Sequence, residues 1–233
     1  SSLVTGVQTC ALPIFLSLLL LVLFGCSNDS FPLMQDEAEG SVTKFNNDTH
    51  GTYGSTYVPL SSENAVIRNA TVFDGLGNMY ENYDIHFSDG KIQALSMNLQ
   101  VDAKEIDGTG KYVSPGIIDI HSHMGVYPAP GVRTSSDGNE ATSPVTAEVW
   151  AEHSVWSQDP QYKLALAGGI TSFHVLPGSA NLFGGRGVTL KNVSANTVTA
   201  MKFPNAPHTL KMACGENPKR VYSSRGPSTR MGN

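Results

Sequence analysis

Two histidines, His121 and His123, follow a short apolar run, 117–120, with one residue between them. On a β-strand, residues i and i+2 project from the same face, so both imidazoles can point toward one position. Imidazole nitrogens are ligands that zinc and similar divalent metals accept. A motif this short is also compatible with two histidines on a half-exposed strand face, because short motifs have a high false-positive rate.

The elements around this pair predict a parallel α/β arrangement. The apolar run 117–120 has the character of a short buried strand. A helix is predicted over 161–167, with an Asp-Pro start before it and two glycines after it, and a strand follows over 170–176. Strand, helix and strand in this order form a βα unit, and the carboxyl ends of such strands carry the active site in barrels.

A second helix is predicted from Ser143 to Trp156, because Val149, His153 and Trp156 fall at helical spacing. His153 is interpreted as a structural residue of that helix. His174 lies in the strand over 170–176, where it is expected to be a core histidine with its hydrogen bonds satisfied.

The segment before the histidines has the pattern of a small antiparallel β unit. A strand is predicted over 65–73, a hairpin is predicted from 83–87 and 92–95 around an Asp-Gly turn, and another strand over 106–113. The breaker Ser114–Gly116 then separates this unit from the strand with the histidines. We therefore expect a small β domain over 65–115 and an α/β domain over 116–233.

A β segment followed by the run 113–123 resembles the amidohydrolase superfamily. The segment 167–172 is similar to the second barrel strand of its imidazolonepropionase- and prolidase-like members. This resemblance implies a small β-sandwich-type domain leading into the N-terminal half of a metal-dependent (β/α)8 TIM-like barrel. It also implies that His121 and His123 are the first ligands of one or two divalent ions, with zinc as the expected metal.

Members of this superfamily often carry a carboxylated lysine on the fourth barrel strand, where it bridges two metals. A barrel of about 250 residues has about 31 residues per unit, which places that strand about 93 residues after the first. Lys211 follows His123 by 211 − 123 = 88 residues, within a predicted strand over 209–215. We expect Lys211 to be the bridging ligand or an ordinary strand lysine, and Glu216 is a competing ligand because some members use a glutamate.

The resemblance implies hydrolysis of a C–N bond in a cyclic amide or peptide-like small molecule by a metal-activated hydroxide. The general-base aspartate is expected beyond residue 233, so we expect this chain to be the front part of a longer protein and to be inactive alone. Two alternatives stay open. One is a deaminase of the same superfamily, whose members typically lack the bridging lysine. The other is a non-catalytic, ligand-binding surface lipoprotein.

Two further groups are interpreted without a catalytic role. Gly184–Gly187 is predicted to be a loop, since no Lys-Ser/Thr pair and helix start follow it as in a phosphate-binding loop. Cys214 is predicted to be a small buried residue. The three cysteines are far apart, which argues against a disulfide framework or a thiolate zinc site.

The N-terminal part, 1–64, is interpreted as segments that precede the folded domains. Residues 1–14 resemble an in-frame translation of a common sequencing adapter, and 15–26 resemble a signal peptide with a lipobox that ends at Cys26. The resemblance implies a bacterial lipoprotein, exported to the cell envelope and anchored in the membrane by a lipid on Cys26. Residues 27–64 are polar and predict a tether.

The net charge of the chain is −5, and no Lys/Arg cluster forms a basic face. A nucleic-acid partner is therefore not expected, and a small-molecule substrate is favoured.

Overall fold

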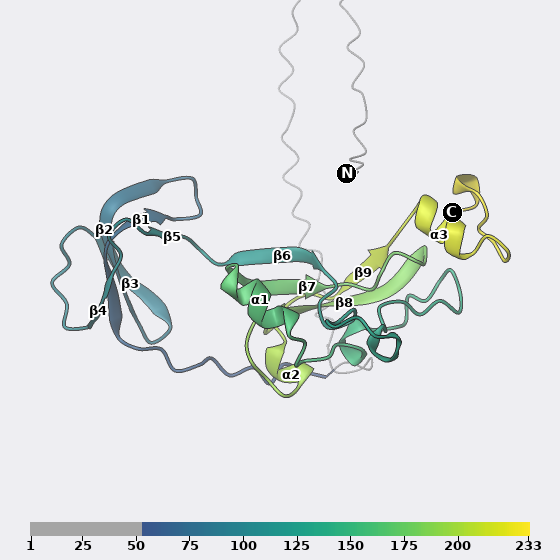
Figure 1. Ribbon diagram of the computed structural model, residues 1–233, viewed down its shortest axis with the longest axis horizontal. Helices are drawn as coiled ribbons and strands as arrows, with labels where there is room; N and C mark the ends of the chain where they lie inside the picture. The colour runs from purple at the N-terminus through teal and green to yellow at the C-terminus, as the bar shows by residue number, and fades with distance from the viewer. Residues whose placement is uncertain (1–52) are drawn as a thin grey trace, which may run out of the picture. The chain divides into compact units, whose positions relative to one another are not determined.

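The computed structural model describes residues 53–233, and Figure 1 shows the arrangement of their elements. The proposed adapter, signal peptide and lipidated Cys26 lie outside the described residues, as does the tether as far as residue 52. The strands are β1 (Ala65–Phe73), β2 (Met79–Ser88), β3 (Lys91–Ser96), β4 (Lys104–Asp107), β5 (Tyr112–Val113), β6 (Ile117–Ser122), β7 (Ile170–Val175), β8 (Phe183–Lys191) and β9 (Thr209–Met212). The helices are η1 (Arg133–Ser135), η2 (Ala151–His153), α1 (Gln161–Ala167), α2 (Val198–Met201), α3 (Glu216–Val221) and η3 (Arg230–Gly232).

Strands β1 to β5 form one sheet in the order β3-β2-β1-β4, with β5 beside β1. The predicted hairpin around Asp89 and Gly90 is confirmed, and both residues have the positive φ that an Asp-Gly turn requires. The expectation of an antiparallel unit is wrong for β4 and β5, because both run parallel to β1. The described residues of this unit form a single sheet, so they do not complete a sandwich by themselves.

Strands β6 to β9 form the second sheet, in sequence order. Strands β6 and β7 are parallel and are connected through α1, which confirms the predicted βα unit and the helix over 161–167. Figure 1 shows α1 beside these two strands. The ring of Tyr162 on α1 stacks on Phe173 of β7 with centroids 5.1 Å apart, which anchors the helix to the sheet.

The expected succession of parallel barrel strands is not present after β7, because β8 runs antiparallel to β7 and β9 runs antiparallel to β8. The reason is the short connection 176–182 between β7 and β8. A return to a parallel strand needs a crossover of about a dozen residues or more, whereas a short loop brings the chain back antiparallel. The sheet is therefore mixed, and β9 is parallel to β7.

The helix predicted from Ser143 to Trp156 is wrong, and only η2 forms there. The backbone of this segment bonds to β8 instead: Thr146 N–H donates to Phe183 O at 2.8 Å, and Arg186 N–H donates to Val149 O at 2.7 Å. Because each backbone N–H and C=O needs one partner, pairing with a strand replaces helical hydrogen bonds. Helical spacing of side chains therefore misled the prediction.

The end of the predicted tether contacts α2 and the residue that follows it. Ser55 donates its hydroxyl hydrogen bond to Lys202 O at 2.7 Å, and Thr56 N–H donates to Thr199 O at 2.9 Å. Lys202 in turn forms a buried ion pair with Glu152 at 2.5 Å.

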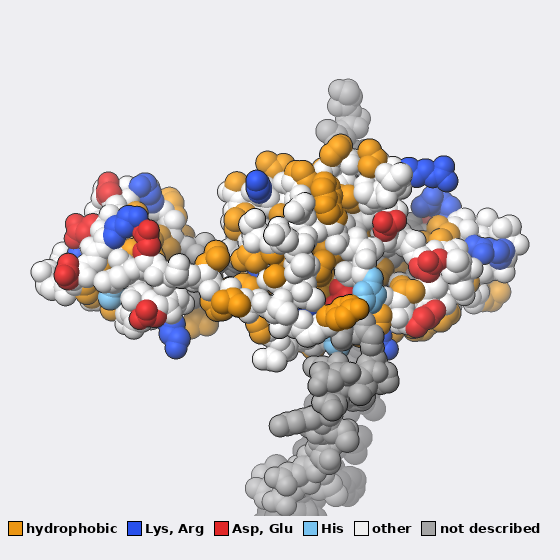
Figure 2. All heavy atoms as spheres, turned by 90° about the horizontal axis from the view of Figure 1, so that it is seen from below, with side chains coloured by type: hydrophobic (Ala, Val, Ile, Leu, Met, Phe, Trp, Pro, Cys, Tyr) orange, Lys and Arg blue, Asp and Glu red, His pale blue; other side chains and the backbone are white. Residues whose placement is uncertain are grey.

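The main core lies around β7 and β8, where Phe173 and Leu190 are fully buried together with Met201 of α2. A smaller core around Ala70 and Ile85 belongs to the first sheet. By contrast, the apolar side chains of β6 are exposed, with Ile118 at 62% and Ile120 at 77%. Figure 2 shows exposed hydrophobic side chains in orange on the face in view. Among residues 53–233, none of the helices combines the length and apolar character needed to span a bilayer.

Candidate metal centre

The carboxyl end of β6 places His121 and His123 next to each other. Their ring centroids are 5.2 Å apart, and the ring planes are nearly perpendicular at 82°. The side chain of Asp119, two residues earlier on the same strand, accepts a hydrogen bond from His121 N–H at 3.1 Å. The alternation of side chains along β6 thus brings the two imidazoles together, as the spacing in the sequence predicts.

The ring of His123 is held in one tautomer by the strand next to it. Its Nδ1 lies 2.9 Å from the carbonyl oxygen of Leu176, which directly follows β7. A carbonyl oxygen only accepts hydrogen bonds, so Nδ1 carries the proton and Nε2 keeps its lone pair. Metal-ligating histidines are commonly oriented through such a second hydrogen bond, so this arrangement fits a metal ligand.

Lys211 of β9 reaches the same place, with its Nζ 3.1 Å from Nε2 of His121. Two strands lie between β6 and β9 in the sheet, a separation of about 14 Å at the usual strand spacing. Side chains of this length can meet across that separation only if the sheet is curved, so that its two edge strands approach each other on one face. Lys211 is 9% exposed, and burial lowers the pKa of its amine.

The environment favours the neutral form of His121. Burial lowers the pKa of His121, and the charge of Lys211 and the ring of His123 lower it further, against the opposing effect of Asp119. A neutral imidazole is the form that coordinates a metal. The lowered pKa of His121 and the Nδ1–H tautomer of His123 are both compatible with binding a divalent ion.

Glu216, the alternative ligand that the sequence suggested, lies on α3. Glu216 lies in the first turn of α3, where its carboxylate is 3.3 Å from Nζ of Lys219. Within residues 53–233, no group of three or more His, Cys, Asp or Glu side chains is arranged to hold a metal. The described residues thus bring two imidazoles and one amine together, without a carboxylate or thiolate that completes a set of three.

Three other interpretations can be compared with the structure. His174 has both ring nitrogens hydrogen-bonded, to Thr189 and Thr209, as expected for a satisfied core histidine. Gly184–Gly187 belongs to β8 rather than to a loop. The prediction that Cys214 is buried is wrong, since this residue is exposed in the connection between β9 and α3.

Tyr127 is a neighbour of the site that the sequence interpretation missed. Its ring lies edge-on to His123 with centroids 5.8 Å apart, and its N–H donates to His123 O at 3.0 Å. Its hydroxyl accepts a hydrogen bond from Asn139. Burial raises the pKa of Tyr127 despite this bond, so the phenol stays neutral. Its position four residues after His123, in the turn that ends β6, is the sequence signal that points to it.

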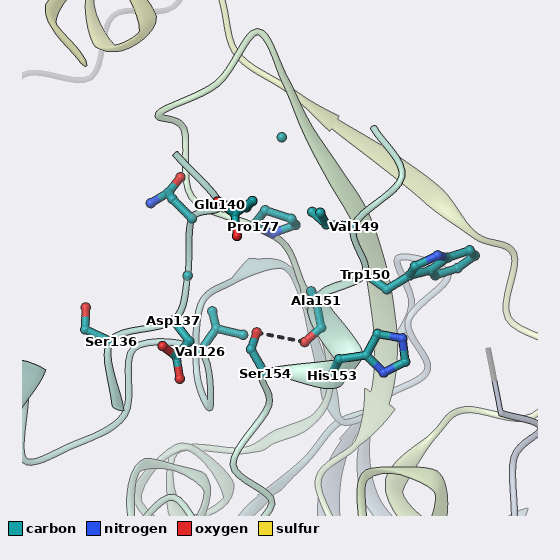
Figure 3. Close-up of a pocket in the computed structure, with 13 residues that line it drawn as sticks. Val126, Ser136, Asp137, Glu140, Val149, Trp150, Ala151, His153, Ser154 and Pro177 are labelled. Carbon is teal, nitrogen blue, oxygen red and sulfur yellow. Dashed lines mark hydrogen bonds between the residues drawn. The ribbon is translucent and has the colours of Figure 1, made fainter. Parts of the chain in front are cut away.

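A pocket of about 290 Å³ adjoins these loops, and Figure 3 shows its lining side chains. Val126 comes from the turn after β6, and Pro177 follows the residue whose carbonyl orients His123. Asp137 and Glu140 give the pocket two exposed carboxylates, and Trp150 is also among its lining residues. The pocket lies beside the turns that hold His123, but its lining includes none of His121, His123 and Lys211.

No protein-family model matches the chain. An amidohydrolase from Thermotoga maritima MSB8, known from its crystal structure, is similar over 72% of this chain and 44% of its own, with 44% sequence identity and a TM-score of 0.66. The amidohydrolase tasK of Hapsidospora irregularis is 38% identical over 142 residues, which are 56% of this chain and 14% of that protein.

A dihydroorotase of Thermoanaerobacter sp. (strain X514) is 47% identical over 60 residues, which are 25% of this chain and 14% of that protein. The chain thus spans less than half the length of each of these three relatives. The structural similarity supports a mixed α/β fold of the kind found in the solved amidohydrolase.

Proposed function

We propose, starting from the support that these similarities give to the amidohydrolase superfamily, that the chain is part of a metal-dependent hydrolase of C–N bonds in amides. One observation carries the proposal. His123 is oriented through Nδ1 by the Leu176 carbonyl and lies next to His121, and His121 contacts Lys211 of β9, the strand at the other edge of the sheet. The names of the relatives, two amidohydrolases and a dihydroorotase, support hydrolysis of an amide, and the last supports a cyclic one.

In this proposal, His121 and His123 hold a divalent ion, with zinc as the expected metal. When bound, the metal activates water and polarises the carbonyl group of the substrate. Lys211 would hold a second ion after carboxylation: the neutral amine forms a bond to the carbon of CO2, one N–H proton passes to water, and the resulting carbamate anion supplies oxygen ligands. The Leu176 carbonyl keeps the ring of His123 in place while the substrate enters and leaves.

The remaining parts of the catalytic centre are assigned to residues outside this chain. They include the further metal ligands and the general-base aspartate, which moves the proton to the leaving nitrogen. The chain by itself is then expected to be inactive. Among residues 53–233, β6 pairs with β7 alone, and its isoleucines are exposed, which agrees with a strand that needs a further neighbour in the active protein.

The test uses the protein expressed from its complete reading frame, reconstituted with zinc. We expect stoichiometric zinc by elemental analysis and hydrolysis of at least one member of a panel of cyclic amides that includes dihydroorotate. His121→Ala and His123→Ala should each weaken zinc binding by more than about 100-fold, because even outer partners of a ligand contribute 10–100-fold.

The matched control is His86→Ala, which removes a histidine from β2 of the first sheet, where its ring bonds to Asn64. This variant should keep its zinc and its activity. Absence of zinc from the wild type, or equal zinc loss in all three variants, would contradict the proposal. Turnover by the segment Ser27–Asn233 alone would contradict the assignment of the remaining catalytic groups to residues outside this chain.

A further inference from the structure

His174 connects two strands on the concave side of the second sheet. Its Nδ1 lies 2.9 Å from the hydroxyl of Thr189 on β8, and its Nε2 lies 2.7 Å from the hydroxyl of Thr209 on β9. A neutral imidazole has one donor and one acceptor, and each threonine hydroxyl can serve as either. The ring is therefore fully used by these two contacts and is not available as a metal ligand.

The contact with Thr209 crosses β8, which lies between β7 and β9. Gly187 stands at the crossing point, directly opposite Thr209 in the pairing of β8 with β9. A Cβ at this position would lie 2.8 Å from Nε2 of His174 and 2.7 Å from Oγ1 of Thr209. The missing side chain of Gly187 is therefore what allows the imidazole to reach the third strand.

Thr209 and Lys211 are two residues apart on β9, so their side chains project from the same face. Their partners in the pairing with β8 are Gly187 and Gly185. The glycine nearest the Lys211 side chain is Gly184, where a Cβ would lie 3.6 Å from Cγ of Lys211. The hydrogen bond from His174 to Thr209 thus holds β9 in place at a position two residues before Lys211.

We propose that His174 is a positioning residue: through Thr209 it holds β9 so that Lys211 lies against His121. This inference rests on the proposed metal centre, since its consequence is measured there. Groups that hydrogen-bond a metal ligand directly typically contribute 10–100-fold to metal affinity. His174 bonds Thr189 and Thr209 and acts on Lys211 only through β9, so we expect an effect at the lower end of that range. A histidine that served only the stability of the sheet would not affect the metal in this way.

The experiment compares two isosteric changes in the complete protein, Thr209→Val and Thr189→Val. Each removes one hydroxyl partner of His174, but only Thr209 lies on the strand of Lys211. Zinc affinity is measured by competition with a chelator. Carboxylation of Lys211 is followed by 13C NMR after incubation with 13C-bicarbonate. We expect Thr209→Val to weaken zinc binding about 10-fold and to reduce the carbamate signal. Thr189→Val should leave both close to the wild type.

His174→Phe should reproduce the effect of Thr209→Val, and His174→Gln, which keeps a donor and an acceptor, should restore part of the affinity. Equal zinc affinities in Thr209→Val and wild type would overturn the positioning role while leaving the metal centre intact. So would equal losses in the two valine variants, because sheet stability alone would then account for them. A wild type that binds no zinc would overturn the proposed function, and the positioning role with it.

Discussion

The amine of Lys211 lies 3.1 Å from Nε2 of His121, although 90 residues separate them in the chain and two strands separate them in the sheet. The contact exists because β6 to β9 form a curved sheet whose concave side collects side chains from both edges. Mutations that act on the curvature or on the strand order should therefore affect the site as much as mutations of the site itself.

Lys211→Met keeps the length and the apolar part of the side chain but removes the amine. If the lysine bridges two ions, we expect the number of zinc ions per chain to fall by one and the carbamate signal to disappear. The control is Lys163→Met, which changes an exposed lysine on α1. Unchanged zinc content and turnover in Lys211→Met would contradict the bridging role and favour the deaminase alternative.

Gly187→Ala introduces a methyl group where His174 and Thr209 approach each other, at distances of 2.8 and 2.7 Å from the new Cβ. Overpacking of this kind typically costs about 1–3 kcal/mol, so we expect a loss of that size in the free energy of unfolding by urea. Gly131→Ala is the matched control, because a Cβ there meets no atom within 4 Å. Equal stability of the two variants would show that the strands separate easily at this point.

Asp84 accepts hydrogen bonds from several groups of the first β unit, and we predict that it makes the free energy of unfolding depend on pH. Burial opposes its ionisation, but the N–H groups of Asn69 and Leu99 and the Arg68 guanidinium together lower the pKa of Asp84 below its ordinary value. A lowered folded-state pKa stabilises the fold above the unfolded value, about 3.9, and this stability is lost as pH falls through the folded-state value.

Asp84→Asn should therefore lower the free energy of unfolding at neutral pH by roughly 1.5–3 kcal/mol, the usual contribution of a hydrogen bond to a charged group. The difference from the wild type should shrink as the pH falls below 4, which urea titrations at several pH values can measure. Asp102→Asn, an exposed residue nearby in the sequence, serves as control. A difference that is constant with pH would contradict the role of the charge.

Cys26 is proposed as the lipid-modified residue of a bacterial lipoprotein, and this prediction is independent of the fold. Expressed from the complete reading frame in a bacterial host, the wild type should incorporate labelled palmitate and sediment with membranes. Cys26→Ser should lose both properties while keeping its zinc. Membrane association without label, or label retained in the serine variant, would refute the assignment.

The sequence alone determined those parts whose signals lie within a few neighbouring residues. The turn at Asp89 and Gly90 is set by residues that tolerate positive φ, and α1 is bounded by an Asp-Pro start and two glycines. The pairing of His121 with His123 follows from the two-residue period of a strand. Each of these features depends on local stereochemistry, so one segment contains the information.

Tertiary structure decided the rest. The direction of β8 follows from the length of the loop before it. The segment around Thr146 does not form a helix, because its backbone groups hydrogen-bond to β8 instead. The contact of Lys211 with His121, and the passage of His174 over Gly187, depend on how strongly the sheet curves. Curvature is a property of several strands packed together, and the local pattern of any single strand does not encode it.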